Sequence, residues 1–353
     1  MDKTDIKELT FEDLRTVLKG MGEPAFRAGQ IFSWLYKKDA SRFEEMSDLG
    51  QTLREKLAAR FTVSWPEPGR HLRSRDGAEK FVVRLADGRS IETVLIPGPG
   101  RATVCLSTQV GCRFGCPFCA SGRPGFGRNL SPAEIINQVL FARRVSGRTA
   151  THVVFMGMGE PLDNYDSVSR AIRLINAPQG MGLAARRITV STCGLLPGIE
   201  KLKALGLQVE LSVSLHAASD ELRNRLVPLN KKYPLAKLVP ALLDYHRATG
   251  RQVTLEYALV KGLNDTLAEA DRLVTLARRV RAKVNLIPLS PTGAPGYEPS
   301  PRPAAVAFVR RLEERGVRAT LRRSKGGDIQ AACGQLAGEA GSRGKGSEPG
   351  GGS

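Results

Sequence analysis

The chain has 353 residues, 41% of them hydrophobic, and its 53 Lys and Arg against 35 Asp and Glu give a formal net charge of +18. No apolar run reaches the roughly 20 residues that span a bilayer, and residues 1–5 are too acidic for a signal peptide, so we expect a globular, cytoplasmic protein without a membrane segment. The positive charge predicts a polyanionic partner such as nucleic acid, although solvated helix faces in an arginine-rich protein would give the same balance.

Residues 8–60 are typical of short helices. Leu9, Leu14 and Leu18 recur at helical spacing, and Gly22-Glu23-Pro24 interrupts the pattern before a second apolar stretch. Basic and aromatic side chains lie together in residues 25–30. We therefore predict an N-terminal helical accessory domain over residues 1–70 that binds RNA; the alternative is a module that only packs on the main domain.

Residues 71–98 change to the alternation of a β-hairpin. Two apolar runs, 81–85 and 91–96, flank the turn residues Asp87 and Gly88. Glu92 falls in the second predicted strand among apolar residues. By pattern alone such a residue is more often a solvent-facing position than a catalytic one.

From residue 99 onward, β-rich runs alternate with amphipathic helical segments. The β-rich runs are 103–107, 151–156, 187–191, 209–214, 253–258 and 283–289. The helical segments lie near 132–145, 166–176, 197–205, 219–226, 235–248 and 265–280. This succession predicts an α/β fold with a parallel sheet, and the lack of a dinucleotide-binding fingerprint favours a partial (β/α)6 barrel over a doubly wound sheet.

The predicted barrel domain extends to residue 337. A helix near 303–315, a strand at 317–321 and a glycine-flanked loop around Cys333 are expected to complete it. The glycine-rich residues 338–353 are expected to form a disordered tail because they offer nothing to bury. Functional sites in such folds lie at the carboxyl ends of the strands.

Three of the six cysteines stand within eight residues, as Cys112, Cys116 and Cys119, directly after the first predicted barrel strand. This crowding does not resemble the disulfide framework of a small secreted domain. The C-x-x-x-C-x-x-C spacing favours an iron–sulfur cluster with one iron left open. The alternative is a zinc site, for which the sequence lacks an obvious fourth ligand; the nearest histidine is His152.

From about residue 9 to 337 the chain resembles the RlmN/Cfr family of radical S-adenosylmethionine (radical-SAM) RNA adenine methyltransferases. The segments that carry the resemblance are 107–112, 125–130, 156–162, 214–217, 225–234 and 331–336, together with the cysteine loop. The resemblance implies a 4Fe-4S cluster held by Cys112, Cys116 and Cys119. It also implies S-adenosylmethionine contacts from Gly159, Glu160, Ser191, Ser214, Leu215, His216 and Ser290. The family usually has asparagine where this chain has Ser290.

The resemblance also implies a mechanism that uses two S-adenosylmethionine molecules per turnover. Cys333 accepts a methyl group from the first, and a radical made from the second removes hydrogen from that S-methyl group. The resulting carbon radical adds to carbon 2 of adenine. Glu92 then removes the ring proton, and Cys105 attacks the sulfur of Cys333, which releases the product and leaves a disulfide.

The implied partners are 23S rRNA at the peptidyl-transferase centre, tRNA next to the anticodon, and a flavodoxin-type electron donor, and we expect a monomer. Methylation of carbon 8 of the rRNA adenosine, as in Cfr-type relatives, is an alternative within the same chemistry. A zinc-stabilised RNA-binding protein without catalysis is an alternative of a different class. The additional Cys193 is interpreted as a small packed residue.

Overall fold

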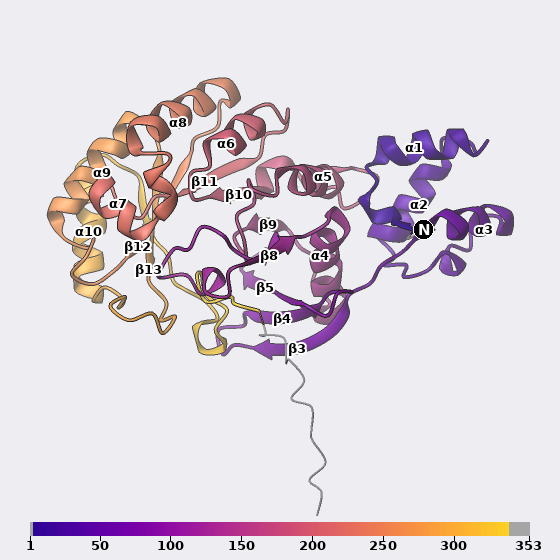
Figure 1. Cartoon of the computed structure of the whole chain (residues 1–353), viewed down its shortest axis with the longest axis horizontal. Helices are drawn as coiled ribbons and strands as arrows, with labels where there is room; N and C mark the ends of the chain where they lie inside the picture. The colour runs from indigo at the N-terminus through magenta and orange to yellow at the C-terminus, as the bar shows by residue number, and fades with distance from the viewer. Residues whose placement is uncertain (1–2, 339–353) are drawn as a thin grey trace, which may run out of the picture.

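Ten strands form one continuous sheet in the computed structural model, which describes residues 3–338 (Figure 1). The strand order is β14-β13-β12-β11-β10-β9-β6-β5-β4-β3. The bounds are β3 Glu67–Arg73, β4 Glu79–Arg84, β5 Ser90–Gly98, β6 Arg101–Cys105, β9 His152–Phe155, β10 Ile188–Thr192, β11 Glu210–Ser214, β12 Thr254–Leu259, β13 Lys283–Pro288 and β14 Ala319–Leu321. Neighbours from β6 to β14 are parallel, as the βα rhythm predicts.

The crossover helices lie on the outer side of the parallel strands, as Figure 1 shows for α4, α5, α6, α8, α9 and α10. Their bounds, with that of α7, are α4 Pro132–Ser146, α5 Tyr165–Asn176, α6 Leu196–Lys203, α7 Asp220–Leu226, α8 Leu235–Thr249, α9 Leu267–Arg279 and α10 Arg302–Glu314. Short 3-10 turns occur at η1 Ile6–Glu8, η2 Phe43–Glu45, η3 Ala120–Gly122, η4 Ala185–Arg187, η5 Pro228–Lys231 and η6 Gly327–Ile329. The predicted partial (β/α)6 barrel is confirmed, and β14 adds one more parallel strand at its edge.

The predicted hairpin is present as β4 and β5, which pair antiparallel with Val82 opposite Glu92. It continues into the barrel because β5 also pairs antiparallel with β6. A third antiparallel strand, β3, was not predicted, and it crosses the expected domain boundary at residue 70. Pro68 and Gly69 within it obscure the alternation of a strand, and such residues are tolerated because β3 is an edge strand.

The N-terminal helices lie beside α4 and α5, at the end of the molecule away from α8 to α10 (Figure 1). They are α1 Phe11–Gly20, α2 Arg27–Tyr36 and α3 Gln51–Arg60, and the short strands β1 Thr4–Asp5 and β2 Phe61–Thr62 pair parallel next to them. The module is tied to the barrel helices by polar contacts. Lys7 donates from Nζ to Oδ1 of Asn137 in α4 at 2.8 Å, and Arg170 of α5 pairs with Asp13 at 2.7 Å.

No helix among residues 3–338 is long and apolar enough to cross a membrane. The division of the chain at residues 70, 98 and 337 stays a proposal. Apart from Gly338, the predicted C-terminal tail lies outside the described residues.

Candidate active site

A pocket with about 1070 Å³ of empty space, part of it open to solvent, lies at the carboxyl ends of the parallel strands. The cysteine loop, the strand ends and the loop of Cys333 all contribute to its lining. The residues predicted from the sequence that line it are Cys112, Cys116, Cys119, Gly159, Glu160, Ser191, Ser214, His216, Ser290 and Cys333.

Two short antiparallel strands flank the cysteine loop, β7 Gln109–Gly111 before it and β8 Phe126–Asn129 after it. Gly111 has φ +72°, and a Cβ there would lie 1.8 Å from the carbonyl oxygen of Gly125, so only glycine fits this close approach.

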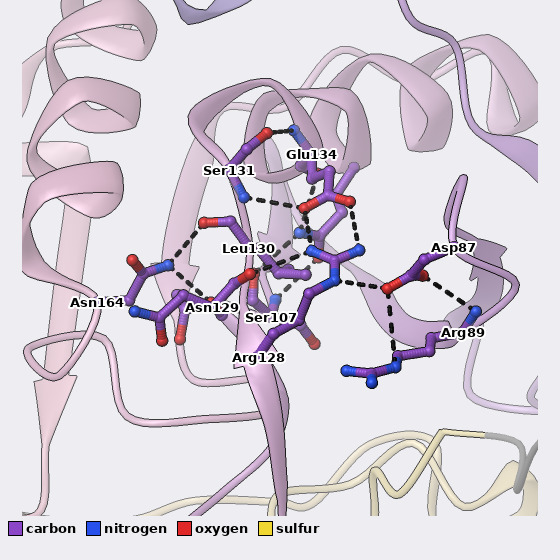
Figure 2. A network of polar contacts seen from close by, with 11 residues as sticks. Asp87, Arg89, Ser107, Arg128, Asn129, Leu130, Ser131, Glu134 and Asn164 are labelled. Atoms are coloured by element: carbon purple, nitrogen blue, oxygen red, sulfur yellow. Dashed lines mark hydrogen bonds and ion pairs between the residues drawn. The ribbon is translucent and has the colours of Figure 1, made fainter. Parts of the chain in front are cut away.

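Arg128 of β8 ties the base of the cysteine loop to two other elements (Figure 2). Its guanidinium makes two 2.8 Å bonds to Glu134 in the first turn of α4, and its Nε lies 2.6 Å from Asp87 in the hairpin turn. Glu134 also completes a capping box with Ser131 at the start of α4. The loop is therefore held between the hairpin and α4.

Two of the three thiols of the cysteine loop have a raised pKa. Burial raises the pKa of Cys112 to about 11 and raises that of Cys116 further, so both are protonated until a metal displaces the proton. Among residues 3–338, no three Cys, His, Asp or Glu side chains could hold one metal ion between them. Thiolates of a four-iron cluster bind different iron atoms and need not converge on a single point.

Gly159 and Glu160 form a tight turn after β9. Gly159 has φ +93°, and a Cβ there would lie 2.5 Å from the Cβ of Gln109. The buried carboxylate of Glu160 accepts backbone hydrogen bonds from Cys193 at 2.8 Å and Leu162 at 3.1 Å. Burial raises the pKa of Glu160. The side chains of Thr192 and Cys193 also hydrogen-bond to Glu160, so its carboxylate is held in a fixed position at the pocket wall.

His216 follows β11 in the left-handed conformation, with φ +57°. Its Nδ1 accepts a hydrogen bond from the backbone of Ala258 at 3.0 Å, and burial lowers its pKa to about 3. The ring is therefore neutral and carries its proton on Nε2. Leu215, by contrast, does not line the pocket: its backbone N–H donates to Glu256, and its carbonyl accepts from Arg223.

Cys105, Glu92 and Cys333 lie around the junction of the hairpin, β6 and the C-terminal loop. Cys105 ends β6 and is buried, and the pKa of its thiol is raised to about 12 by burial and by the nearby Cys333. Cys333 is exposed. Glu92 pairs with Lys80 at 2.9 Å and accepts from the backbone of Ala337 at 2.9 Å. All six cysteines are free.

The chain matches two family models. One, the Radical SAM superfamily, covers residues 106–274, and the other, the ribosomal RNA large subunit methyltransferase N-terminal domain, covers residues 4–63. A probable dual-specificity RNA methyltransferase RlmN from Pelotomaculum thermopropionicum is 46% identical over 95% of this chain and 92% of that protein. The chain belongs to the RlmN family of radical SAM RNA methyltransferases. The resemblance seen in the sequence is thereby confirmed.

Further comparisons agree with the RlmN assignment. The dual-specificity RNA methyltransferase RlmN of Magnetococcus marinus is 46% identical over 95% of each chain. The crystal structure of a radical SAM methyltransferase from Sphaerobacter thermophilus is 45% identical, with a TM-score of 0.89 over 94% of this chain and 99% of that one. Membership of the radical SAM superfamily implies a 4Fe-4S cluster and S-adenosylmethionine.

The pocket of this RlmN-family chain suits those two groups. Its cysteine thiols can bind iron, and its glycines leave room for a ligand to approach the backbone closely. Its hydroxyl and carboxylate groups can hydrogen-bond a polar ligand. Sequence reasoning missed one residue of its lining, Glu256, and one buried residue that bonds to the lining residue Cys193, Arg223. Glu256 lines the pocket from β12, where its signal was a lone acid in an otherwise apolar strand. The buried Arg223 donates to the carbonyls of Cys193 and Leu215, and no sequence pattern marked it.

Proposed function

We propose that this protein methylates carbon 2 of an adenosine in 23S rRNA and of the adenosine next to the anticodon in tRNA. One observation carries the proposal: the cysteine loop and Cys333, which come from opposite ends of the barrel domain, line the same pocket. The relatives named dual-specificity RNA methyltransferases support the two RNA substrates. Both substrates imply a cytoplasmic location.

The chain supplies the groups that hold and move atoms in this reaction. When bound, the cluster delivers an electron to S-adenosylmethionine, two molecules of which are used per turnover. We assign the three iron-binding thiolates to Cys112, Cys116 and Cys119. Gly159, Glu160, Ser191, Ser214, His216 and Ser290 are assigned to the polar contacts of S-adenosylmethionine. Leu215 does not line the pocket, and its backbone bonds to Glu256 and Arg223 hold its neighbours Ser214 and His216 in place.

Three further residues are assigned to the transfer of carbon to RNA. The Cys333 sulfur loses its proton and accepts the methyl group. That methyl carbon would lose a hydrogen atom and bond to carbon 2 of the adenine as a radical. Glu92 takes the proton from carbon 2, exchanging its contact with Ala337 for the substrate, and the unpaired electron of the ring would leave to the electron-transfer centre. The Cys105 thiolate then attacks the Cys333 sulfur. The carbon–sulfur bond breaks with its electron pair on the carbon, which takes up a proton to become the methyl group. The disulfide that forms must be reduced before the next turnover. We propose a flavodoxin-type electron donor and a monomeric enzyme; the net charge of +18 suits an acidic donor.

The function is tested by mass spectrometry of nucleosides from rRNA and tRNA of cells with and without the gene. We expect 2-methyladenosine to disappear without the gene and to return with the native chain but not with Cys333→Ala. Finding 8-methyladenosine would overturn the carbon-2 assignment. Finding neither product would overturn the methyltransferase.

The role of Cys105 has a separate test. Because this thiol is proposed to release the product, Cys105→Ala is expected to accumulate protein crosslinked to RNA, seen as a slow band that nuclease removes. Cys333→Ala is the control, since it lacks the methyl-carrying sulfur and forms no crosslink. A Cys105→Ala protein that binds its cluster but carries no RNA contradicts the role.

A further inference from the structure

Glu256 presents an incompletely bonded carboxylate to the pocket. The residue is 4% exposed and lies in the middle of β12. Its Oε1 accepts hydrogen bonds from Ser212 Oγ at 3.0 Å and from Asn285 Nδ2 at 3.1 Å. Its Oε2 is buried and has no hydrogen-bond partner among the residues that the structure describes.

A buried carboxylate oxygen without a donor is unfavourable, because the oxygen has lost water and gained nothing in exchange. Burial accordingly raises the pKa of Glu256. Ser212 and Asn285 hold the carboxylate from neighbouring strands on both sides, so its orientation is fixed. Glu256 lines the pocket, so a donor on a bound ligand would complete the hydrogen bonding of Oε2.

The strand register indicates which part of the pocket this oxygen serves. Ser214 lies directly opposite Glu256 on β11, and Asn285 lies opposite it on β13. Paired residues of adjacent parallel strands lie about 4.8 Å apart and point to the same face. Ser191 is likewise opposite Ser212. Glu256 thus shares its row with Ser214, which is assigned to S-adenosylmethionine, and Ser191 lies in the row two residues earlier, on the same face.

We propose that Glu256 is a further ligand-binding residue, whose Oε2 accepts a hydrogen bond from the adenosine part of S-adenosylmethionine. The inference rests on the proposed function of this pocket. The donors of an adenosine are its ribose hydroxyls and its 6-amino group. The target adenosine of RNA offers the same 6-amino donor, but the depth of Glu256 in the sheet, beside Ser214, favours the cofactor.

The test compares native protein, Glu256→Gln and Glu210→Gln, all loaded with their cluster, by calorimetric titration with S-adenosylmethionine and with S-adenosylhomocysteine. Loss of a hydrogen bond to a charged group is expected to weaken both affinities roughly tenfold to hundredfold in Glu256→Gln. Glu210→Gln is the matched control, because Glu210 also lies on a barrel strand but pairs with Arg251 and does not line the pocket. Its affinities are expected to stay within about twofold of native.

Analogues of S-adenosylhomocysteine that lack the 2′-hydroxyl, the 3′-hydroxyl or the 6-amino group then locate the bond. The analogue without the bonded group should lose affinity for native protein and lose no more for Glu256→Gln. Unchanged cofactor affinity in Glu256→Gln overturns the inference, and if RNA affinity falls instead, the oxygen serves the target adenosine. If Glu256→Gln does not fold, the shorter carboxylate of Glu256→Asp is expected to show the same loss.

These outcomes are separable from the fate of the proposed function. Cofactor affinity that depends on Glu256 in a native protein that makes no methyladenosine would reject the RNA reaction and keep the ligand contact. Normal methylation by the native protein, with unchanged cofactor affinity in both glutamate variants, would keep the RNA reaction and reject the ligand contact.

Discussion

His216 shows how one residue can couple the pocket to the stability of the fold. Its backbone carbonyl accepts from Asn264 Nδ2 at 2.8 Å, which holds the left-handed conformation, while Ala258 holds its ring. Burial, and then the charge of Arg223, lower its pKa to about 3. The neutral ring is therefore an integral part of the native state.

This burial predicts a pH dependence of stability. In the unfolded chain a histidine binds a proton as the pH falls below about 6.5, whereas native His216 does not until about pH 3. The free energy of unfolding should therefore fall by about 1.4 kcal/mol per pH unit below pH 6.5 on account of this residue. Urea unfolding of native protein and His216→Gln between pH 7.5 and 5 measures it, and the variant should show the flatter profile. Parallel profiles would contradict the prediction.

The candidate site was only partly accessible to sequence reasoning, for a reason visible in single residues. The meeting of Cys112, Cys116 and Cys119 in one place could be predicted because they stand within eight residues, and all three line the pocket. Glu256 could not, because what marks it is an unpaired oxygen, and its other oxygen is bonded by Ser212 and Asn285, 44 and 29 residues away in sequence. The sequence shows Glu256 only as an acidic residue within a largely apolar strand, which does not reveal whether its oxygens are bonded.

Among the elements, the hairpin holds the loop that carries Cys333. Lys80 of β4 pairs with Glu92 of β5 at 2.9 Å, and its Nζ also donates to the carbonyl of Gln330 at 3.1 Å. Glu92 in turn accepts from the backbone of Ala337. The buried ion pair thus binds both ends of the loop, which connects the hairpin's packing to the position of the Cys333 sulfur.

Replacing Lys80 by methionine should therefore loosen this loop. The change leaves Glu92 buried without its cation, which typically costs about 3–5 kcal/mol of stability. Hydrogen exchange should rise in residues 327–337 while the barrel strands stay protected. Lys261→Met is the matched control, since its pair with Glu298 is exposed and is worth at most about 1 kcal/mol. Equal protection of the loop in both variants would contradict this role.

The same elements show where sequence patterns succeed. The strands β4 and β5 were predicted because one turn joins two runs of alternating apolar and polar residues. The barrel units were predicted because each contains a β-rich run followed by an amphipathic helical segment. The edge strand β3 was missed because its own composition is not typical of a strand. Its extended conformation depends on its hydrogen bonds to β4. Pairing of that kind depends on the assembled sheet.

At the scale of the whole molecule, the barrel and the N-terminal module form one body with a shared core. Buried apolar residues run without a break from Ile6 through Phe141 of α4 to the barrel strands. Arg143 of α4 binds Asp39 and the carbonyl of Tyr36 in the same contact. An RNA bound to the module would therefore be held in a defined position relative to the pocket.

The net charge of +18 predicts how that RNA binding responds to salt. If about six phosphates are neutralised by Lys and Arg, counterion release should weaken RNA affinity about 10³-fold between 50 and 200 mM salt. Fluorescence anisotropy with a labelled tRNA anticodon stem-loop measures the slope. S-adenosylmethionine affinity serves as the internal control, because a small ligand with one net positive charge carries no condensed counterions, so its affinity should change little over the same range. An RNA affinity equally insensitive to salt would show that base contacts or shape, and not the basic surface, dominate recognition.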